Sequence, residues 1–268
     1  MSDTTAVIPC WNAGDTLLDA VASVRAQTLP VAEIVVVDDG STEAGTREVL
    51  AALANEAGVR VLRQPNAGLP AARNAGFSAA TTENVVPLDA DDRLHPRFLA
   101  RCRAALVAHP RAGFAYTDIR FFGERTGVHR QLPYNFHDEL FRNQISVCAL
   151  IRRRAWEAVH GYREDFRDGA EDWEFWISLG AAGFHGVRVP EPLFEYRVRR
   201  GSMSTHTEKV LPEITARIRE VHRDLYATER LATIRDEWKG RWNPRDPAGW
   251  IGRVRHRIER IRTGGGET

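Results

Sequence analysis

The chain has 268 residues, of which 43% are apolar and 27% are charged, as is ordinary for a globular protein with room for a full core. The formal net charge is +1, so nothing in the overall charge favours nucleic acid as a partner. Lys209 and Lys239 are the only lysines, and arginine carries the remaining positive charge. A GC-rich coding sequence and phosphate binding both explain this bias.

The three cysteines, Cys10, Cys102 and Cys148, are far apart and lack metal-ligand spacing. An odd, unpatterned set fits a reducing compartment, so we interpret all three as buried small hydrophobic residues. The sequence starts without a secretory signal pattern, and it contains no run of about 20 apolar residues that could span a bilayer. These features predict a cytoplasmic protein, which could also lie peripherally at the inner face of the cell membrane.

The first half of the chain alternates predicted strands with predicted helices. Strands are expected at residues 5–9, 33–37, 59–62 and 85–88, and helices after Gly14 and at 46–57 and 71–80. The β-branched run at 33–37 is typical of a strand buried on both faces. This alternation predicts an α/β fold with a mostly parallel sheet and helices on both faces.

Acidic residues follow two of these strands, at the sheet edge where α/β proteins bind ligands. Asp38 and Asp39 end the second strand, and Asp89, Asp91 and Asp92 end the fourth. A single aspartate there would be interpreted as a helix cap or a turn residue. Five carboxylates exceed what the following helices need as caps and would repel one another, so a bound cation would explain them.

The second half of the chain is also predicted to contain both strands and helices. His95 is interpreted as a helix cap and Pro96 as the first residue of a helix that includes 98–108. Strands are expected at 113–122, 146–152, 187–189 and 194–198, a loop or hairpin up to 135, and helices at 155–159 and 170–179.

The C-terminal part of the chain is predicted to be helical. Ile214, Ile218, Val221 and Leu225 fall on one face of a helix. The stretch 250–262 places an apolar stripe among five arginines. This pattern fits either a helix packed on the main domain or an interfacial helix on anionic lipid.

A series of motifs, in order along residues 5–205, resembles the family 2 glycosyltransferases, which have the GT-A fold. The matching stretches are VIPCWNAGDTL, QTLP, VVVDDGST, QPNAGLPAARNAG, VPLDADD, GYREDF, AEDWEFWISL and EYRVRRGSMS. The resemblance implies a Rossmann-like nucleotide-diphospho-sugar transferase with a mixed sheet and helices on both faces. Its GT-A domain would span residues 1–205, with a donor half at 1–100, an acceptor half at 101–205 and a helical extension at 206–268.

The resemblance also implies a pocket for the nucleotide donor. The residues that it places there are Pro9, Asn12, Asp38, Asp39, Gly68, Arg73 and Asn74. Asp39 would accept a hydrogen bond from the base, and Asp38 would lie near the ribose. A tight turn at Gly68 would bring backbone close to the ligand, and Arg73 would line the base and diphosphate side together with its neighbour Asn74.

Asp89-Ala90-Asp91 matches the Asp-x-Asp motif of the family. We assign Asp91 as the direct ligand of Mg²⁺ or Mn²⁺, with Asp89 and Asp92 in support, because these ions prefer oxygen ligands. The ion would neutralise charge on the departing nucleoside diphosphate. Family members often have a histidine where this chain has Arg199, followed by Arg200, and an arginine can pair with diphosphate oxygens. His206 is a candidate substitute ligand, although its position favours a surface histidine.

Asp172 matches the catalytic base of the family. It would take the proton of the acceptor hydroxyl in a single displacement that inverts the anomeric centre. Glu171, Trp173 and Trp176 could raise its pKa by like charge and by desolvation. Without the resemblance, the Glu171-Asp172 pair would be interpreted as acids that favour the start of a helix. The tryptophans fit either the core or a platform for the acceptor sugar.

These assignments predict an inverting glycosyltransferase that moves a sugar from a nucleoside diphosphate donor, by default a UDP-sugar, to an acceptor hydroxyl. A glycan or lipid-linked acceptor in polysaccharide or glycolipid assembly is the expected setting. Two alternatives are a nucleotidyltransferase and a non-catalytic sugar-nucleotide-binding protein. A nucleotidyltransferase should have a glycine-rich basic loop near the N-terminus, and residues 9–15 lack one. A dehydrogenase is also disfavoured, because no GxGxxG motif follows the first strand.

Overall fold

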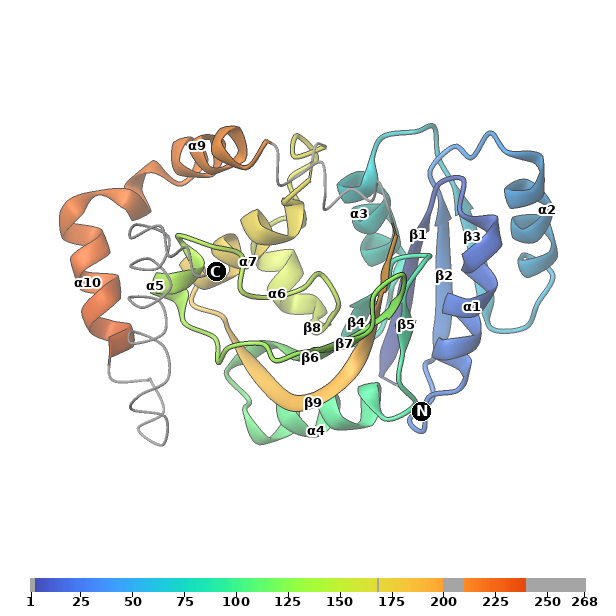
Figure 1. Cartoon of the computed structure of the whole chain (residues 1–268), viewed down its shortest axis with the longest axis horizontal. Helices are drawn as coiled ribbons and strands as arrows, with labels where there is room; N and C mark the ends of the chain where they lie inside the picture. Colours follow the sequence, from blue (N-terminus) through green and yellow to red (C-terminus); the bar gives the residue numbers. More distant parts are fainter. Residues whose placement is uncertain (1–2, 168, 200–209, 240–268) are drawn as a thin grey trace, which may run out of the picture.

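A computed structural model of the chain describes residues 3–167, 169–199 and 210–239 and shows one mixed sheet with helices around it (Figure 1). The strand order is β3-β2-β1-β4-β8-β6-β9-β5, with β7 paired to β6. The strands are β1 (Thr4–Cys10), β2 (Glu33–Asp38), β3 (Val59–Arg63), β4 (Asn84–Pro87), β5 (Arg93–Leu94), β6 (Ala112–Gly123), β7 (Gly127–His129), β8 (Ala149–Arg152) and β9 (His185–Val198).

The first four long strands are parallel neighbours, because β2 and β4 flank β1 and β3 adds to β2. β8 runs antiparallel to both β4 and β6 and joins the two parts of the sheet, and β9 runs parallel to β6. The sheet therefore continues across residue 100, where the sequence predicted a division into donor and acceptor halves. Val35, Val36 and Val37 are completely buried, as their β-branched run predicted.

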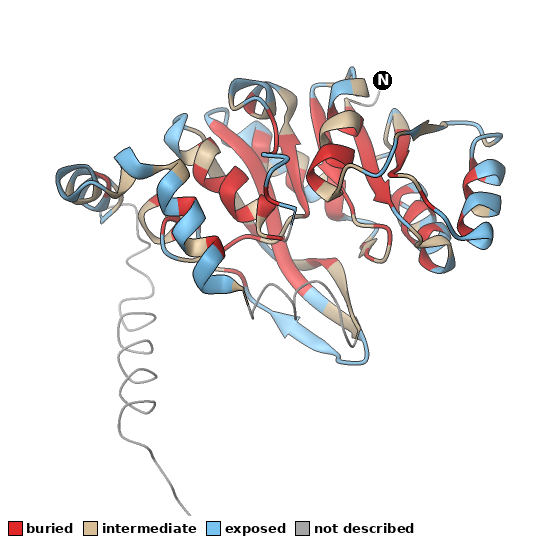
Figure 2. Ribbon diagram, turned by 90° about the horizontal axis from the view of Figure 1, so that it is seen from above, coloured by how far each residue is buried: buried red, intermediate tan, exposed pale blue. Residues whose placement is uncertain are grey.

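Helices cover both faces of this sheet (Figure 2). The sheet therefore separates the hydrophobic core into two clusters, one under the helices of each face. The helices on one face are α1 (Gly14–Arg25), α2 (Ala44–Leu53) and α4 (Phe98–Ala108). Those on the other face are α3 (Leu69–Ala79), α6 (Arg153–Ala158) and α7 (Glu171–Ala181), with the short α5 (Phe136–Glu139) beside them. The predicted α/β architecture is confirmed, and Cys10, Cys102 and Cys148 are all buried free thiols within it.

Gly76 lets α3 lie directly on β1. A Cβ atom at this position would fall 2.2 Å from Cγ1 of Val7, which is completely buried. We therefore expect Gly76→Ala to lower the free energy of unfolding by about 1–3 kcal/mol, because the helix must move away from the sheet. Gly45→Ala in α2 is the control, since nothing lies within 4 Å of its added Cβ. Urea denaturation that gives equal stability for both variants would contradict this packing.

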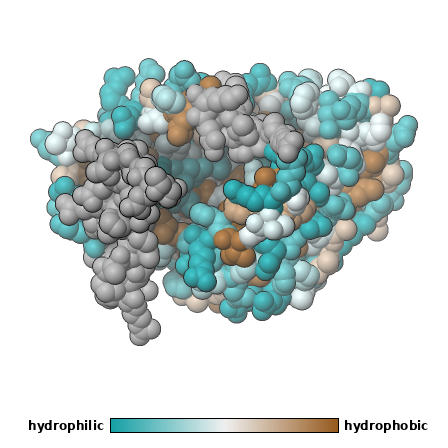
Figure 3. Space-filling view, viewed as in Figure 1, coloured by the Kyte–Doolittle hydropathy of each residue, from teal (hydrophilic) through white to brown (hydrophobic). Residues whose placement is uncertain are grey.

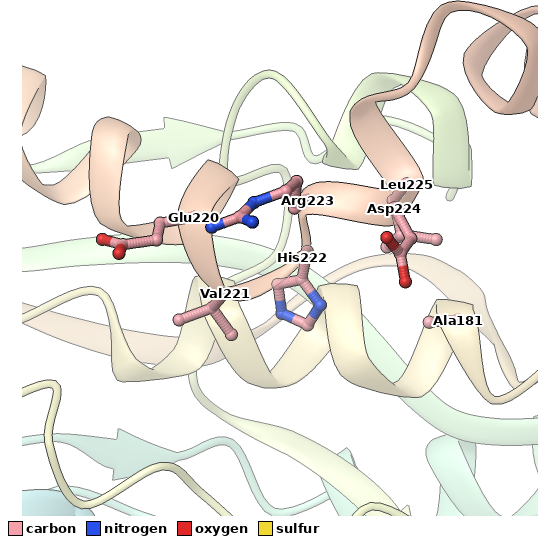
Figure 4. Close-up of a pocket in the computed structure, with 7 residues that line it drawn as sticks. All are labelled: Ala181, Glu220, Val221, His222, Arg223, Asp224 and Leu225. Carbon is pink, nitrogen blue, oxygen red and sulfur yellow. The ribbon is translucent and has the colours of Figure 1, made fainter.

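The C-terminal helices pack on the α5–α7 side of the molecule (Figure 1). They are α9 (Leu211–Val221), the 3₁₀ helix η1 (Arg223–Tyr226) and α10 (Thr228–Lys239). Ile214, Ile218 and Ile234 are buried, and the Trp238 ring meets the Tyr134 ring edge-on with centroids 5.3 Å apart. A hollow of about 360 Å³ lies where α9, η1 and the end of α7 meet, and His222 points into this region (Figure 4).

Three sequence expectations need correction. α4 begins at Phe98, with Arg97 as its N-cap, so Pro96 is not its first residue; the Nδ1 atom of His95 accepts a hydrogen bond from Arg97 N at 3.2 Å. The two strands expected at 187–189 and 194–198 are one strand, β9, because register irregularities opposite Asp118 accommodate its prolines. The predicted C-terminal helix ends at Val221, and Leu225 lies in η1.

Candidate active site

Asn12 ties the loop after β1 to the start of α2. Its Oδ1 atom accepts hydrogen bonds from Thr42 N at 2.8 Å and from Glu43 N at 3.0 Å. The backbone of Asn12 is left-handed, with φ of 50°, a conformation that asparagine tolerates better than most residues. Asn12 thus fixes the loop that follows β1 against the start of α2. The nearby Pro9 is buried in β1.

Asp38 and Asp39 organise the loops at the end of β2. The Asp39 carboxylate accepts three hydrogen bonds, from the side chain of Gln64 and from the backbone of Ala67 and Gly68, all at 2.8–2.9 Å. Asp38 Oδ1 accepts one from Ser41 N at 2.8 Å. Gly68 has φ of 94°, which glycine adopts without strain. Contacts of these residues with a base or a ribose stay predictions.

Arg73 joins the two acidic regions of the predicted site. Its side chain is 1% exposed and leaves α3 between the end of β4 and the start of α7. Nη2 donates to Asp89 Oδ1 at 2.7 Å, and Nη1 donates to Glu171 Oε1. A planar guanidinium is suited to this double role, because its donors point in fixed directions. The Arg73 guanidinium therefore holds Asp89 and Glu171, the residue beside Asp172, close to one another.

Asn74 has different neighbours from those that the sequence suggested. Its Oδ1 atom accepts from Tyr162 N at 2.8 Å, and its Nδ2 atom donates to Tyr162 O at 2.8 Å and Glu164 Oε1 at 3.1 Å. Trp156 Nε1 also donates to Oδ1 at 3.3 Å. In this structure the amide therefore holds the Gly161-Tyr162 turn, and a contact of Asn74 with a donor stays a prediction. Arg73 and Asn74 have different partners because they are adjacent on a helix and project in different directions.

The carboxylates that follow β4 differ in environment. The side chains of Asp89 and Asp91 are 25% and 40% exposed, whereas Asp92 is 1% exposed and Ala90 is buried. Burial, together with the nearby carboxylates, raises the pKa of Asp91 and raises that of Asp92 well above its usual range. Asp92 Oδ1 accepts from Arg197 N at 2.7 Å, but its buried Oδ2 has no partner among the described residues. Negative charge is thus incompletely compensated here.

Arg199 approaches this cluster from the end of β9. Its Nε atom lies 3.8 Å from Asp91 Oδ2, and Nη1 lies 3.9 Å from Asp15 Oδ2. The preceding Arg197 donates to the backbone oxygen of Asp91 at 2.7 Å. Arg199 is thus beside the proposed metal ligand, where the resemblance placed it, whereas Arg200 and His206 lie outside the described residues.

The donor set after β4 suits a hard divalent cation. Asp89 and Asp91 offer accessible carboxylate oxygens beside the buried Asp92. Within the described residues, no three His, Cys, Asp or Glu side chains form a ready metal-binding group. Two protein carboxylates leave room for diphosphate oxygens and water, which is how Mg²⁺ is commonly held. The residues therefore fit the predicted ion, which remains a prediction.

Asp172 stands in the first turn of α7, next to Glu171. Its Oδ1 atom accepts from Trp173 N at 2.7 Å and from Asn143 Nδ2 at 3.1 Å. Burial and the Glu171 carboxylate raise the pKa of Asp172 to about 7, against the opposing effects of Arg73 and the two donors. A carboxylate with a pKa near neutrality suits a general base, because it is ionised in a useful fraction yet binds a proton well.

The tryptophans of α7 belong to the core. Trp176 is completely buried, and the indole of Trp173 donates to Glu139 O at 2.7 Å. Of the two roles that the sequence left open for these tryptophans, the structure shows the core role and not a platform for the acceptor sugar. Trp11, which the sequence reasoning passed over, is 57% exposed next to Asn12. A large aromatic residue immediately after a buried strand was the signal that could have marked it.

Figure 3 shows hydrophilic residues over much of the described surface on this face, with hydrophobic residues scattered among them. The hollow in Figure 4 is not part of the candidate site, since only Ala181 and residues 220–225 line it and none of them is a predicted site residue.

A mixed α/β sheet with helices on both faces and acidic residues at its strand ends fits the GT-A fold. The profile of the family described as Glycosyl transferase family 2 matches residues 5–162. The chain belongs to this family, as the motifs indicated. Along the described residues, no helix has the length and apolar character needed to cross a membrane.

Relatives and solved structures agree with this assignment. The O-antigen biosynthesis protein RfbC of Myxococcus xanthus is 32% identical over 207 residues, a match to 74% of this chain and only 16% of RfbC. TuaG of Bacillus subtilis, named for teichuronic acid biosynthesis, is 27% identical over 81% of this chain and 87% of its own. The crystal structure of S. aureus TarS 1–349 with UDP shares the fold at 18% identity, with a TM-score of 0.64 over 92% of this chain and 74% of that one.

Proposed function

We propose that this protein transfers a single sugar from a UDP-sugar to a hydroxyl of a glycan or lipid-linked acceptor, with inversion at the anomeric carbon. The observation that carries the proposal is the bridge made by buried Arg73. It brings the predicted metal ligand Asp89 and the neighbour of the predicted base Asp172 onto the two ends of one guanidinium. This bridge would hold the donor-side and acceptor-side groups in fixed relation, as a direct displacement requires.

On the donor side, Asp91 and Asp89 would hold Mg²⁺ or Mn²⁺. The ion, when bound, neutralises charge on the departing diphosphate. Arg199 lies beside Asp91 and can donate to diphosphate oxygens, taking the place that histidine often has in the family. Exposed Trp11 and the loops held by Asn12 and Asp39 would bind the nucleoside.

On the acceptor side, Asp172 would accept the proton of the attacking hydroxyl. The acceptor oxygen forms a bond to the anomeric carbon as its O–H bond breaks. The bond from that carbon to the diphosphate oxygen breaks, and the nucleoside diphosphate leaves with the electron pair. One displacement from the opposite face inverts the configuration, and no covalent sugar–enzyme bond is needed.

The names and ligands of similar proteins support the donor and the setting. A structure of S. aureus TarS 1–349 contains UDP-GlcNAc, and it matches 76% of this chain with a TM-score of 0.63 at 19% identity. RfbC is named for O-antigen biosynthesis, and TuaG for teichuronic acid. We therefore propose surface polysaccharide assembly as the setting. Cytoplasmic placement, with membrane contact through residues 250–262, is part of the same proposal, and those residues lie outside the described ones.

A thermal-shift panel of UDP-, GDP- and dTDP-sugars, with and without Mn²⁺, tests the donor assignment. A UDP-sugar near 100 times its Kd should raise the melting temperature by about 5 °C, because it binds only the folded protein. The shift should depend on Mn²⁺, and Asp91→Asn should remove the metal-dependent part. Asp165→Asn is the control, since its exposed carboxylate pairs with Arg163 and Arg217 away from the donor residues. Absence of any response to all three nucleotides would overturn the proposal.

A further inference from the structure

One side chain outside the family motifs contacts the predicted base. Asn143 is exposed and lies between α5 and β8, 29 residues before Asp172, yet its Nδ2 atom donates to Asp172 Oδ1 at 3.1 Å. Trp173 N donates to the same oxygen at 2.7 Å. Both donors to this carboxylate therefore meet Oδ1, and Oδ2 accepts no hydrogen bond from the residues that the structure describes.

The segment that carries Asn143 is anchored on both sides. Glu139, which is completely buried, accepts from Gln144 N at 3.4 Å and from Gln144 Nε2 at 3.3 Å. The Tyr226 hydroxyl of η1 donates to Leu140 O at 2.6 Å. These contacts fix the backbone before and after Asn143, so the amide is presented to Asp172 from a braced segment although its own surface is open to solvent.

We propose that Asn143 is a positioning residue, which engages Oδ1 of Asp172 and thereby leaves Oδ2 as the atom that takes the proton of the acceptor hydroxyl. The inference rests on the proposed role of Asp172 as base. It adds two points to that role: which oxygen acts, and which side chain outside the α7 motif selects it. A carboxylate held by two donors on one oxygen has less freedom to rotate, so its second oxygen is pre-aimed.

The surrounding charges give the amide a second effect. Burial and Glu171 raise the pKa of Asp172, whereas Arg73 from α3 and the Asn143 donor lower it. Two further groups face this region: Glu139 of α5, whose own pKa burial raises well above its usual range, and the buried hydroxyl of Tyr162. A hydrogen bond to an ionised carboxylate favours the ionised form, so loss of the amide should make Asp172 hold its proton to higher pH.

Asn143→Ala and Asn143→Asp test this inference. The pH dependence of kcat/KM, followed as UDP release from a UDP-sugar with acceptor, should have its acidic limb shifted upward by about one pH unit in Asn143→Ala. Asn143→Asp keeps the shape of the side chain but adds a negative charge beside Asp172, so the acidic limb should move further toward high pH. Asn55→Ala is the matched control: it removes an exposed amide that donates to Ala51 O at 2.8 Å, just after α2, and it should leave the limb in place.

A measurement without substrates separates this inference from the proposed function. Protein labelled with ¹³C at the aspartate carboxyl carbons gives a signal for Asp172 that is identified by its loss in Asp172→Asn. Its titration midpoint should rise in both Asn143 variants and stay in place in Asn55→Ala. An unchanged midpoint in Asn143→Ala overturns the positioning role even if Asp172 is the base. Retained turnover in Asp172→Asn would instead remove the base assignment, whatever the midpoint does.

Discussion

Asp172→Asn should lower turnover by about 1,000-fold while leaving the affinity for the nucleotide donor within twofold, as expected for loss of a general base. The amide is nearly isosteric with the carboxyl group, but it cannot accept the proton of the acceptor hydroxyl. Steady-state kinetics give the turnover, and calorimetric titration with the UDP-sugar and Mn²⁺ gives the affinity. Asp165→Asn, which removes an exposed carboxylate on the same side of the fold, should retain activity.

The same residue predicts a pH profile for the unaltered enzyme. Because burial and Glu171 raise the pKa of Asp172 to about 7, the base is mostly protonated below that pH and mostly ionised above it. We therefore expect kcat/KM to fall as the pH is lowered through 7, approaching tenfold per pH unit well below it. Turnover that persists in Asp172→Asn, or a profile that is flat down to pH 5, would exclude Asp172 as the base.

Arg73→Met should be strongly destabilising, with a loss of about 3–5 kcal/mol in the free energy of unfolding. The methionine fills similar space, but Asp89 loses its cation and Glu171, which is 5% exposed, loses its partner. Two carboxylates near each other without a counter-charge are costly to keep ionised. Urea denaturation monitored by tryptophan fluorescence measures the loss.

Two further variants test whether the stability loss in Arg73→Met comes from the carboxylates left without a counter-charge. Arg97→Met breaks an exposed ion pair with Glu191 and should cost less than about 1 kcal/mol. Adding Glu171→Gln to Arg73→Met should restore part of the stability, because one of the abandoned charges is removed. If Arg73→Met were no less stable than Arg97→Met, the bridge between the two acidic regions would have no energetic role.

Local sequence patterns predicted the parallel part of the fold well. The run at 33–37 marks β2, because a strand buried on both faces needs consecutive β-branched residues. The shorter pattern at 59–62 marks β3, which is only partly buried at the edge of the sheet. The patterns failed at the prolines of β9, where pairing with β6 outweighed the local preference for a break. They also placed the start of α4 too early, since helix ends depend on the few hydrogen bonds that a cap supplies.

The sequence by itself determined the family, through its motifs, and it predicted where the chemistry lies: at carboxylates after the strand ends and at the start of α7. Only the tertiary structure decided their partners. Arg73 bridges Asp89 and Glu171, Asn74 turns away to Tyr162, and Asn143 engages Asp172 across 29 residues of chain. The physical reason is that periodicity records which face of an element is buried, whereas a hydrogen bond between distant segments exists only after packing has set their separation and direction.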